Sequence, residues 1–152
     1  MEKKRLQIAQ LETKLNVFGA VQSTVVPPMG WIRTIRMSLG ISLQQLADKL
    51  GRSRQSVREI EIREKEGAIT LKALRQVADV LDMELVYGFV PKDGSLDELI
   101  ERKARELATR IVMRTSNTMQ LEDQGVSYAR LQKAIDERTA LIKHELPKAL
   151  WD

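Results

Sequence analysis

The sequence contains no cysteine and a single histidine, His144. Without cysteine there can be no disulfide bond, no thiol catalysis and no cysteine-ligated zinc. One histidine cannot build a histidine-rich metal site, and the chain carries no nucleophile–base set and no glycine-rich phosphate loop. These absences indicate that the protein is not an enzyme and that it requires no metal or other cofactor.

Aromatic residues and long apolar runs are also scarce. Phe, Trp and Tyr make up 4% of the 152 residues, which is too few for the stacking platforms that bind single-stranded nucleic acid. No apolar run is as long as a transmembrane helix, and no apolar signal core follows the basic residues 1–5. We therefore expect a cytoplasmic protein without a membrane partner.

The composition is that of a globular protein, with 43% hydrophobic and 30% charged residues and a net charge of +4. The positive charge is concentrated in one segment. Residues 31–58 contain six basic residues and one acidic residue, a net of +5, whereas residues 59–90 carry a net of −3 and residues 91–152 have eleven of each sign. A local basic excess of this kind is the electrostatic footprint of a protein that binds nucleic-acid phosphates.

The stretch 42–61 overlaps this basic segment and reads as two short helices joined by a tight turn. Ser42 is a good N-cap, and Gln45 completes a capping box with it. Gly51 follows the first helix, where a residue that tolerates positive φ is favoured, and Ser53 caps the second helix. Apolar residues at helical spacing face inward in both helices: Leu43, Leu46, Ala47, Leu50, Val57 and Ile60.

The second helix of this stretch has polar side chains on its outward face. Arg54 and Gln55 stand side by side in its first turn. Arginine recognises guanine and glutamine recognises adenine, each through two hydrogen bonds, and a helix that enters the major groove presents its first residues to the base edges. The pattern therefore predicts a helix-turn-helix in which residues 54–59 read DNA.

Hydrophobic periodicity predicts further helices outside this stretch. We expect them over residues 3–17, 31–39, 71–81, 96–119 and 128–146, with a loop over residues 19–29. The charged connection 62–69 is expected to extend the second helix and to break at Gly67. Residues 84–90 are rich in β-branched and aromatic side chains and predict a short β-strand, which needs a partner either within the chain or across a dimer axis.

Together these elements predict a mainly α-helical protein with three parts. Residues 1–26 form an N-terminal helix and linker, residues 27–90 form the DNA-binding domain with its short strand, and residues 91–152 form a two-helix extension for dimerisation or partner binding. The N-terminal helix packs on the protein's own core, packs on a second subunit or simply covers the surface, and the sequence leaves these alternatives open.

A series of caps and core residues runs from residue 31 to residue 85: Ile35–Arg36, Gly40–Ser42, Leu46–Ala47, Leu50–Gly51, Ser53–Val57, Ile60–Glu61 and Leu74–Leu81. In this series the chain resembles the Cro/repressor-type (XRE) helix-turn-helix family. The resemblance implies a compact five-helix DNA-binding domain that acts as a symmetric homodimer on the double-stranded DNA of a palindromic operator.

The resemblance also implies roles for individual positions. The residues that face the bases would be Arg54, Gln55 and Glu59. The phosphate-side positions would be Ser42, the Leu43 amide, Arg52 and Ser56, to which we add Arg58 because of its charge. Arg36 and Glu61 would form a structural ion pair.

The chain departs from the family's pattern directly after Glu61. The family usually has Asn-Gly there, followed by a short loop, whereas this chain has Ile62–Arg63 and a connection about two residues longer. The phosphate contact of that loop is therefore not carried over, and Arg63 and Lys65 are only candidates for it.

Four further motifs extend over the rest of the chain: P-P-x-G-W-I-R at residues 27–33, E-L-V-Y-G-F-V-P at 84–91, T-M-Q-L-E-D-Q at 118–124 and L-W-D at 150–152. In these motifs the whole chain resembles the mobile mystery protein A family. That resemblance implies an antitoxin-like regulator that represses its own operon and is encoded beside a Fic-domain partner.

The segment from Thr118 to Glu122 is similar to the inhibitory motif of Fic antitoxins, in which the glutamate pairs with an arginine at the site of an ATP phosphate. Asp123 stands where that motif has glycine or asparagine, and the alternative interpretation is an ordinary helix end and turn. Two functions therefore compete. The first is a sequence-specific repressor, and the second is an inhibitor of a Fic-type toxin through residues 95–152, with DNA binding secondary or absent.

Overall fold

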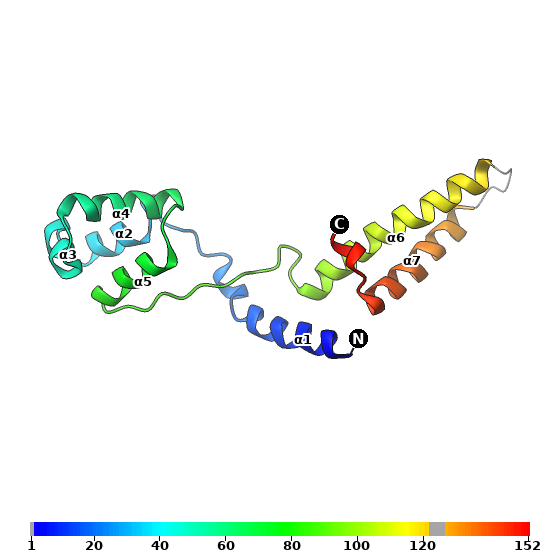
Figure 1. Ribbon diagram of the computed structural model, residues 1–152, viewed down its shortest axis with the longest axis horizontal. Coiled ribbons are helices and arrows are strands. Elements are labelled where there is room, and N and C mark those ends of the chain that lie inside the picture. Colours follow the sequence, from blue (N-terminus) through cyan, green and yellow to red (C-terminus); the bar gives the residue numbers. More distant parts are fainter. Residues whose placement is uncertain (1, 122–126) are drawn as a thin grey trace. The chain divides into compact units, whose positions relative to one another are not determined.

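The computed structural model of the protein describes residues 2–121 and 127–152 (Figure 1). Within these ranges the chain forms seven α-helices and two short 3-10 helices and has no β-strand, so the prediction of a mainly α-helical protein is confirmed. The chain divides into two compact units. The central unit is Ser23–Gly88, and the terminal unit combines Met1–Gln22 with Phe89–Asp152.

Four helices build the central unit, one fewer than the five-helix domain that the resemblance implied: α2 (Trp31–Ser38), α3 (Leu43–Leu50), α4 (Arg54–Glu66) and α5 (Leu71–Val80). Each presents one apolar stripe to a common core, as the periodicity predicted. The side chains of Leu46 and Val57 are fully buried at the centre of this core. The other buried members of the cluster are Ile32, Ala47, Ile60, Val77 and Leu81.

Local capping bonds set the bounds of α3 and α4. The Ser42 hydroxyl accepts from the Gln45 N–H at 3.1 Å, and the Gln45 side-chain oxygen accepts from the Ser42 N–H at 2.8 Å, which forms the predicted capping box. Gly51 ends α3 in the left-handed region at φ 63°. Ser53 then caps α4 by accepting from the Ser56 N–H at 3.1 Å.

The helix α4 continues for 13 residues and ends where the sequence predicted a break. Gly67 adopts φ 75°, and the N–H of Ala68 reaches back to the Arg63 carbonyl at 2.8 Å. The residues after Glu61 are therefore helical, and they place Glu64 and Lys65 on the last turn of α4.

The predicted β-strand over residues 84–90 is absent, and this prediction was wrong for the chain by itself. Residues 83–91 form neither helix nor strand. A strand requires a neighbour that supplies ladder hydrogen bonds, and no β-ladder is formed anywhere in the described parts of this chain. β-Propensity could therefore not be realised at this position.

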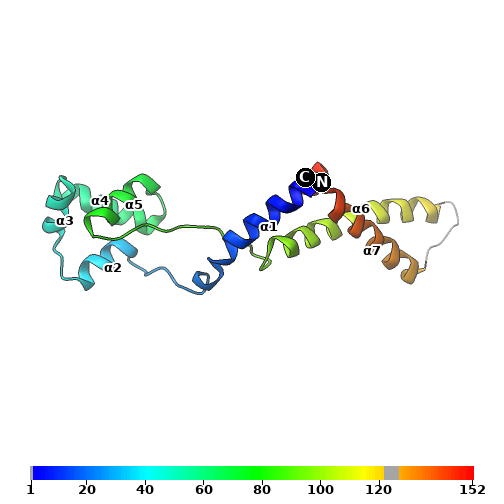
Figure 2. The same ribbon diagram turned by 90° about the horizontal axis from the view of Figure 1, so that it is seen from below.

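The terminal unit consists of α1 (Glu2–Asn16), η1 (Gly19–Val21), α6 (Leu96–Leu121), α7 (Tyr128–Glu145) and η2 (Lys148–Trp151). The helices α6 and α7 lie side by side as an antiparallel pair (Figures 1 and 2). Their core is formed by Ile100, Ala104, Ala108, Ile135, Ile142 and Leu150, with Leu150 contributed by η2.

The helix α1 packs on this pair of helices from its own chain. Ile8 contacts the core cluster, and the Glu12 carboxylate accepts from the N–H of Leu96 at 2.7 Å, at the first turn of α6. Arg5 and His144 approach to 2.8 Å between α1 and the last turn of α7. The three-part division at residues 26 and 90 stays a prediction, whereas the structure joins α1 to α6 and α7. No described helix is long and apolar enough to cross a membrane.

Candidate nucleic-acid interface

The first turn of α4 exposes two of the three residues predicted to read bases. Arg54 and Gln55 are both exposed, directly after the Ser53 cap. Arg58 and Glu59 are exposed one turn further along, while Val57 between them is buried in the core. The core thus fixes the rotation of α4, so that its polar face points away from the central unit.

Glu59 has a neighbour of opposite charge on the same helix. Its carboxylate lies 3.6 Å from the Arg63 guanidinium, with both side chains more than half exposed. A pair of this kind between exposed side chains is weak and easily exchanged for another partner. Glu59 therefore remains available as an acceptor at the surface.

Arg36 and Glu61 form an ion pair between α2 and α4. The Arg36 side chain is 12% exposed and that of Glu61 is 7% exposed. A second bond joins Arg36 Nη2 to Glu61 Oε2 at 3.3 Å, and Arg36 Nη1 also donates to the carbonyl of Ile41 at 3.1 Å. One guanidinium therefore holds α4 against α2 and fixes the turn that leads into α3.

A further link between α2 and α4 was not predicted from the sequence. The Glu64 carboxylate accepts from the N–H of Ile32 at 2.8 Å and so caps the N-terminus of α2. Gly30 makes room for it, because a Cβ at that position would lie 2.6 Å from Glu64 Oε2 and its φ is +84°. The only signal in the sequence was a glycine, with no capping side chain, in front of a predicted helix.

A basic groove of about 520 Å³ opens between α2, α3 and the outward face of α4. Its acid, Glu61, is paired with Arg36, so the groove keeps an excess of positive charge. The residues that line it are Met29, Arg33, Arg36, Leu43, Arg54, Arg58, Glu61, Ile62 and Lys65. Such a groove attracts anions, and a helix N-terminus such as that of α3 adds to this attraction.

The groove brings together some of the predicted phosphate-side positions and leaves others outside. Leu43 and Arg58 line it beside Arg54. Arg52 is placed differently, because its guanidinium donates to the Gln76 side chain on α5 at 3.4 Å. Arg33 and Lys65 line the groove although they were not among the assigned positions.

Two of the predicted phosphate-side residues also have capping roles. The hydroxyl of Ser42 is the N-cap acceptor of α3, and its backbone N–H is held by Gln45. Ser56 is half-buried and gives its N–H to Ser53. The predicted inhibitory pair cannot be placed in the same way, since Glu122 lies outside the described residues and Thr118 is described only by its backbone in α6.

The short helices of the central unit, the exposed start of α4 and the basic groove define a helix-turn-helix domain with an anion-attracting face. No cluster of three metal-ligating side chains occurs in the parts of the chain that are described. Comparison with protein families supports the same class, because residues 32–87 match the family described as Helix-turn-helix.

The matched range is less than half of the chain and falls entirely within the central unit. It confirms the resemblance to the XRE-type helix-turn-helix family for these residues, and domains of this family belong to DNA-binding regulators. The comparisons with curated proteins and with solved structures find no match. The resemblance of the whole chain to the mobile mystery protein A family stays a prediction.

Proposed function

We propose that this protein is a sequence-specific transcriptional repressor that binds double-stranded DNA through its central unit. The observation that carries the proposal is the basic groove beside the exposed first turn of α4, within the range that matches the helix-turn-helix family. The charge is local, and it includes Arg54, one of the three side chains proposed to read bases.

In the proposed complex α4 enters the major groove with its N-terminus toward the bases. Arg54 hydrogen-bonds the O6 and N7 atoms of a guanine, and Gln55 the N6 and N7 atoms of an adenine. Glu59, one turn later, accepts from a cytosine amino group. The phosphate contacts hold this register and come from the N-termini of α3 and α4 and from neighbouring side chains: Ser42, the Leu43 amide, Arg52, Ser56 and Arg58.

The proposed regulator is a homodimer on a palindromic operator. Two copies of α4 would lie in successive major grooves about 34 Å apart. By its resemblance to the mobile mystery protein A family, the protein would repress its own operon in the manner of an antitoxin. The first DNA to test is therefore the region upstream of its own gene.

The test is a binding titration on that upstream DNA with Arg54→Ala and Gln55→Ala. Each change should weaken binding by about 1–3 kcal/mol, or roughly 5-fold to 150-fold, and relax base preference at one position per half-site. Arg110→Ala in the terminal unit removes one positive charge at a distant sequence position and serves as the control, with affinity unchanged. Binding that survives both changes at full strength contradicts the assignment of α4.

A salt titration separates this function from a protein-binding role. Binding to DNA releases counterions, so the logarithm of the association constant should fall linearly as the logarithm of the salt concentration rises. Arg58→Ala should reduce that slope by about 1 without changing base preference. A salt-independent association would argue against the DNA-binding proposal.

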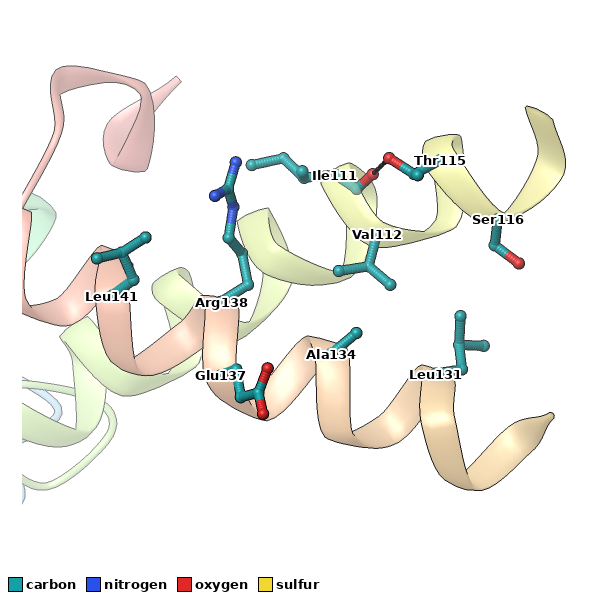
Figure 3. Close-up of a pocket in the computed structure, with 9 residues that line it drawn as sticks. All are labelled: Ile111, Val112, Thr115, Ser116, Leu131, Ala134, Glu137, Arg138 and Leu141. Atoms are coloured by element: carbon teal, nitrogen blue, oxygen red, sulfur yellow. Dashed lines mark hydrogen bonds between the residues drawn. The ribbon is translucent and has the colours of Figure 1, made fainter. Parts of the chain in front are cut away.

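A second candidate function is inhibition of a Fic-domain partner through residues 95–152. The observation that favours it is a groove of about 480 Å³ between α6 and α7. In Figure 3 the side chains of Val112 and Ser116 on α6 point toward those of Leu131 and Ala134 on α7. The rest of the lining is Ile111, Thr115, Glu137, Arg138 and Leu141.

The residues that line this groove indicate what chemistry a bound partner would need. Arg138 has no ion-pair or hydrogen-bond partner within the described residues, and it lies beside the apolar residues of the lining. A segment of the Fic partner with an apolar face and one acidic side chain would satisfy both features.

Co-purification with the protein encoded beside this gene tests the second candidate. Ala134→Glu and Arg138→Glu should abolish co-purification, and the paired control Arg54→Ala should leave it intact. Retention of the partner by both α7 variants would exclude the groove as its binding site.

A further inference from the structure

The segment between α5 and α6 combines an apolar sequence with an exposed position. Residues 83–90 read M-E-L-V-Y-G-F-V, whereas flexible connections are usually built from polar residues, glycine and proline. Val86 is 70% exposed, Tyr87 54% and Phe89 81%. Large apolar side chains gathered in this way mark an interaction site more often than a linker.

The backbone of this segment is also unpaired. The N–H of Met83 bonds to the Ala78 carbonyl at 2.8 Å, which closes α5, and the next backbone bond is from Gly94 to Pro91 at 3.1 Å. Among the described residues, no backbone hydrogen bond is recorded for residues 84–90. The segment thus offers a row of N–H and C=O groups of the kind to which a second strand can add.

We propose that this segment is the contact between two copies of the chain: residues 84–92 of one copy pair with residues 84–92 of the other as antiparallel strands centred on Gly88. This inference rests on the proposed function, and it adds to that function the location of the dimer interface. The chain alone forms no strand because only the second copy supplies the partner.

The register follows from the order of the side chains. A two-fold axis through an antiparallel pair requires one residue to face its own copy, so that opposing residue numbers sum to twice the central number. With Gly88 at the centre, Glu84 faces Lys92, Val86 faces Val90 and Tyr87 faces Phe89. Each of these pairs occurs twice, and unlike charges, β-branched pairs and aromatic pairs all stabilise cross-strand contacts.

Neighbouring registers lose these matches. With Tyr87 at the centre, Glu84 faces Val90 and Val86 faces Gly88. With Phe89 at the centre, Lys92 faces Val86. Of the centres from Val86 to Phe89, only Gly88 places Glu84 opposite a basic residue.

Pro91 agrees with the same register. Opposing residues in an antiparallel pair alternate between hydrogen-bonded and non-hydrogen-bonded positions. If the two Gly88 residues form a hydrogen-bonded pair, Pro91 falls in a non-hydrogen-bonded position opposite Leu85, where its missing N–H costs nothing. Tyr87 and Phe89 then occupy the non-hydrogen-bonded pair, in which side chains approach most closely.

The two-stranded ribbon formed by the two copies would pack against the rest of the protein. A ribbon of two strands is marginal in water unless one face packs on further structure. Met83 and Leu85 line an apolar groove of about 600 Å³ on the central unit, together with Ile35, Leu74 and Val77. The first residues of the segment therefore already lie beside α2 and α5 of the central unit.

Cysteine cross-linking of the full chain tests the register, because the native sequence has no cysteine. Under mild oxidation Gly88→Cys should give a disulfide-linked dimer in high yield, because the two copies of residue 88 would face each other within disulfide reach. Glu84→Cys and Lys92→Cys should each stay monomeric on a denaturing gel, and the double variant should cross-link. Equal cross-linking at all three single positions, or none at Gly88→Cys, would overturn the proposal.

Charge exchange gives a second measurement that does not depend on disulfide geometry. In sedimentation analysis without DNA, Glu84→Lys and Lys92→Glu should each raise the dimer dissociation constant roughly tenfold, because each creates two like-charge pairs. The double variant should restore the native value. A double variant no better than the single variants would refute the register.

These measurements distinguish failure of the interface from failure of the DNA proposal. The Arg54→Ala variant should still cross-link through Gly88→Cys, because its defect lies in base recognition. Specific DNA binding without any cross-linking at Gly88→Cys would overturn the interface and leave the proposed function standing. Cross-linking without specific DNA binding would overturn the repressor and support the interface.

Discussion

The central and terminal units use their charged residues in opposite ways. In the terminal unit, two cations are closely paired across helices: Lys143 lies 2.8 Å from Glu101, and Arg105 lies 2.7 Å from Asp136. In the central unit, Arg33, Arg54, Arg58 and Lys65 share one groove and have no ion-pair partner among the described residues. Paired cations link one helix to another, whereas a cluster of uncompensated cations attracts external anions.

The two units also differ in how their helices are stabilised. The helices α2 and α3 have 8 residues each, a length at which isolated helices are unstable, and they depend on caps and on a shared aliphatic core. The helices α6 and α7 have 26 and 18 residues and approach closely over the fully buried Ala104 and Ala108. The central unit is therefore sensitive to single caps and ion pairs, and the terminal unit to the packing of long helix faces.

The largest expected effects come from truncating one core leucine in each unit. Leu46 is 0% exposed and Leu150 is 2% exposed, so Leu46→Ala and Leu150→Ala should each cost about 2–5 kcal/mol of unfolding free energy. Because each unit has its own core, we expect each change to lower amide-exchange protection only in its own unit. Loss of protection in both units from either change would contradict the division into two independent cores.

A smaller effect is expected from breaking the pair between Arg36 and Glu61. Glu61→Ala leaves a largely buried guanidinium without its partner and should destabilise the central unit by about 3 kcal/mol in denaturant unfolding. Glu59→Ala is the matched control on the same helix, and its exposed pair with Arg63 should contribute less than about 0.5 kcal/mol. Similar losses of unfolding free energy from both changes would show that burial of the Arg36–Glu61 pair does not determine its contribution to stability.

The smallest effect concerns the acid stability of the terminal unit. The hydrogen bond from Lys143, with help from Arg105, holds the pKa of the Glu101 carboxyl below its ordinary value of 4.5. A lowered pKa means that the stabilisation is present above pH 4.5 and is lost as the pH falls through the lower folded-state value. Glu101→Gln should remove this acid dependence and cost about 0.5 kcal/mol at neutral pH.

The control for this last prediction is Glu137→Gln, whose pair with Lys133 on the same helix is long at 3.9 Å and highly exposed. Unfolding curves recorded between pH 3 and pH 7 would compare the two variants. If Glu101→Gln retained the acid dependence of the native protein, the pairing of Glu101 with Lys143 would not be the source of that dependence.

The features that were predictable from the sequence are those determined by neighbouring residues. The caps at Ser42 and Ser53 and the breaks at Gly51 and Gly67 depend on partners within five residues, and all four are in place. The pairing of Arg36 with Glu61 spans 25 residues and was expected only by resemblance to a family.

The features that were missed depend on the tertiary structure. Glu64 caps a helix that begins 33 residues earlier, at Trp31, and Glu12 meets Leu96 across 84 residues, and neither carboxylate has a local signature. Arg33 was not predicted as a phosphate-side residue, because its place in the basic groove depends on the fold and not on its sequence neighbours. The strand over residues 84–90 was predicted from propensity alone, which cannot supply a pairing partner.

The terminal unit is assembled from the two ends of the chain, with the central unit inserted between them. During synthesis α1 therefore leaves the ribosome before its packing partners α6, α7 and Leu150 have been made. The central unit is contiguous from Ser23 to Gly88 and can fold while the second half of the chain is still being translated. The helix-turn-helix domain can thus complete its fold before the terminal unit does, and a translation product that stops after Gly88 would still contain that domain.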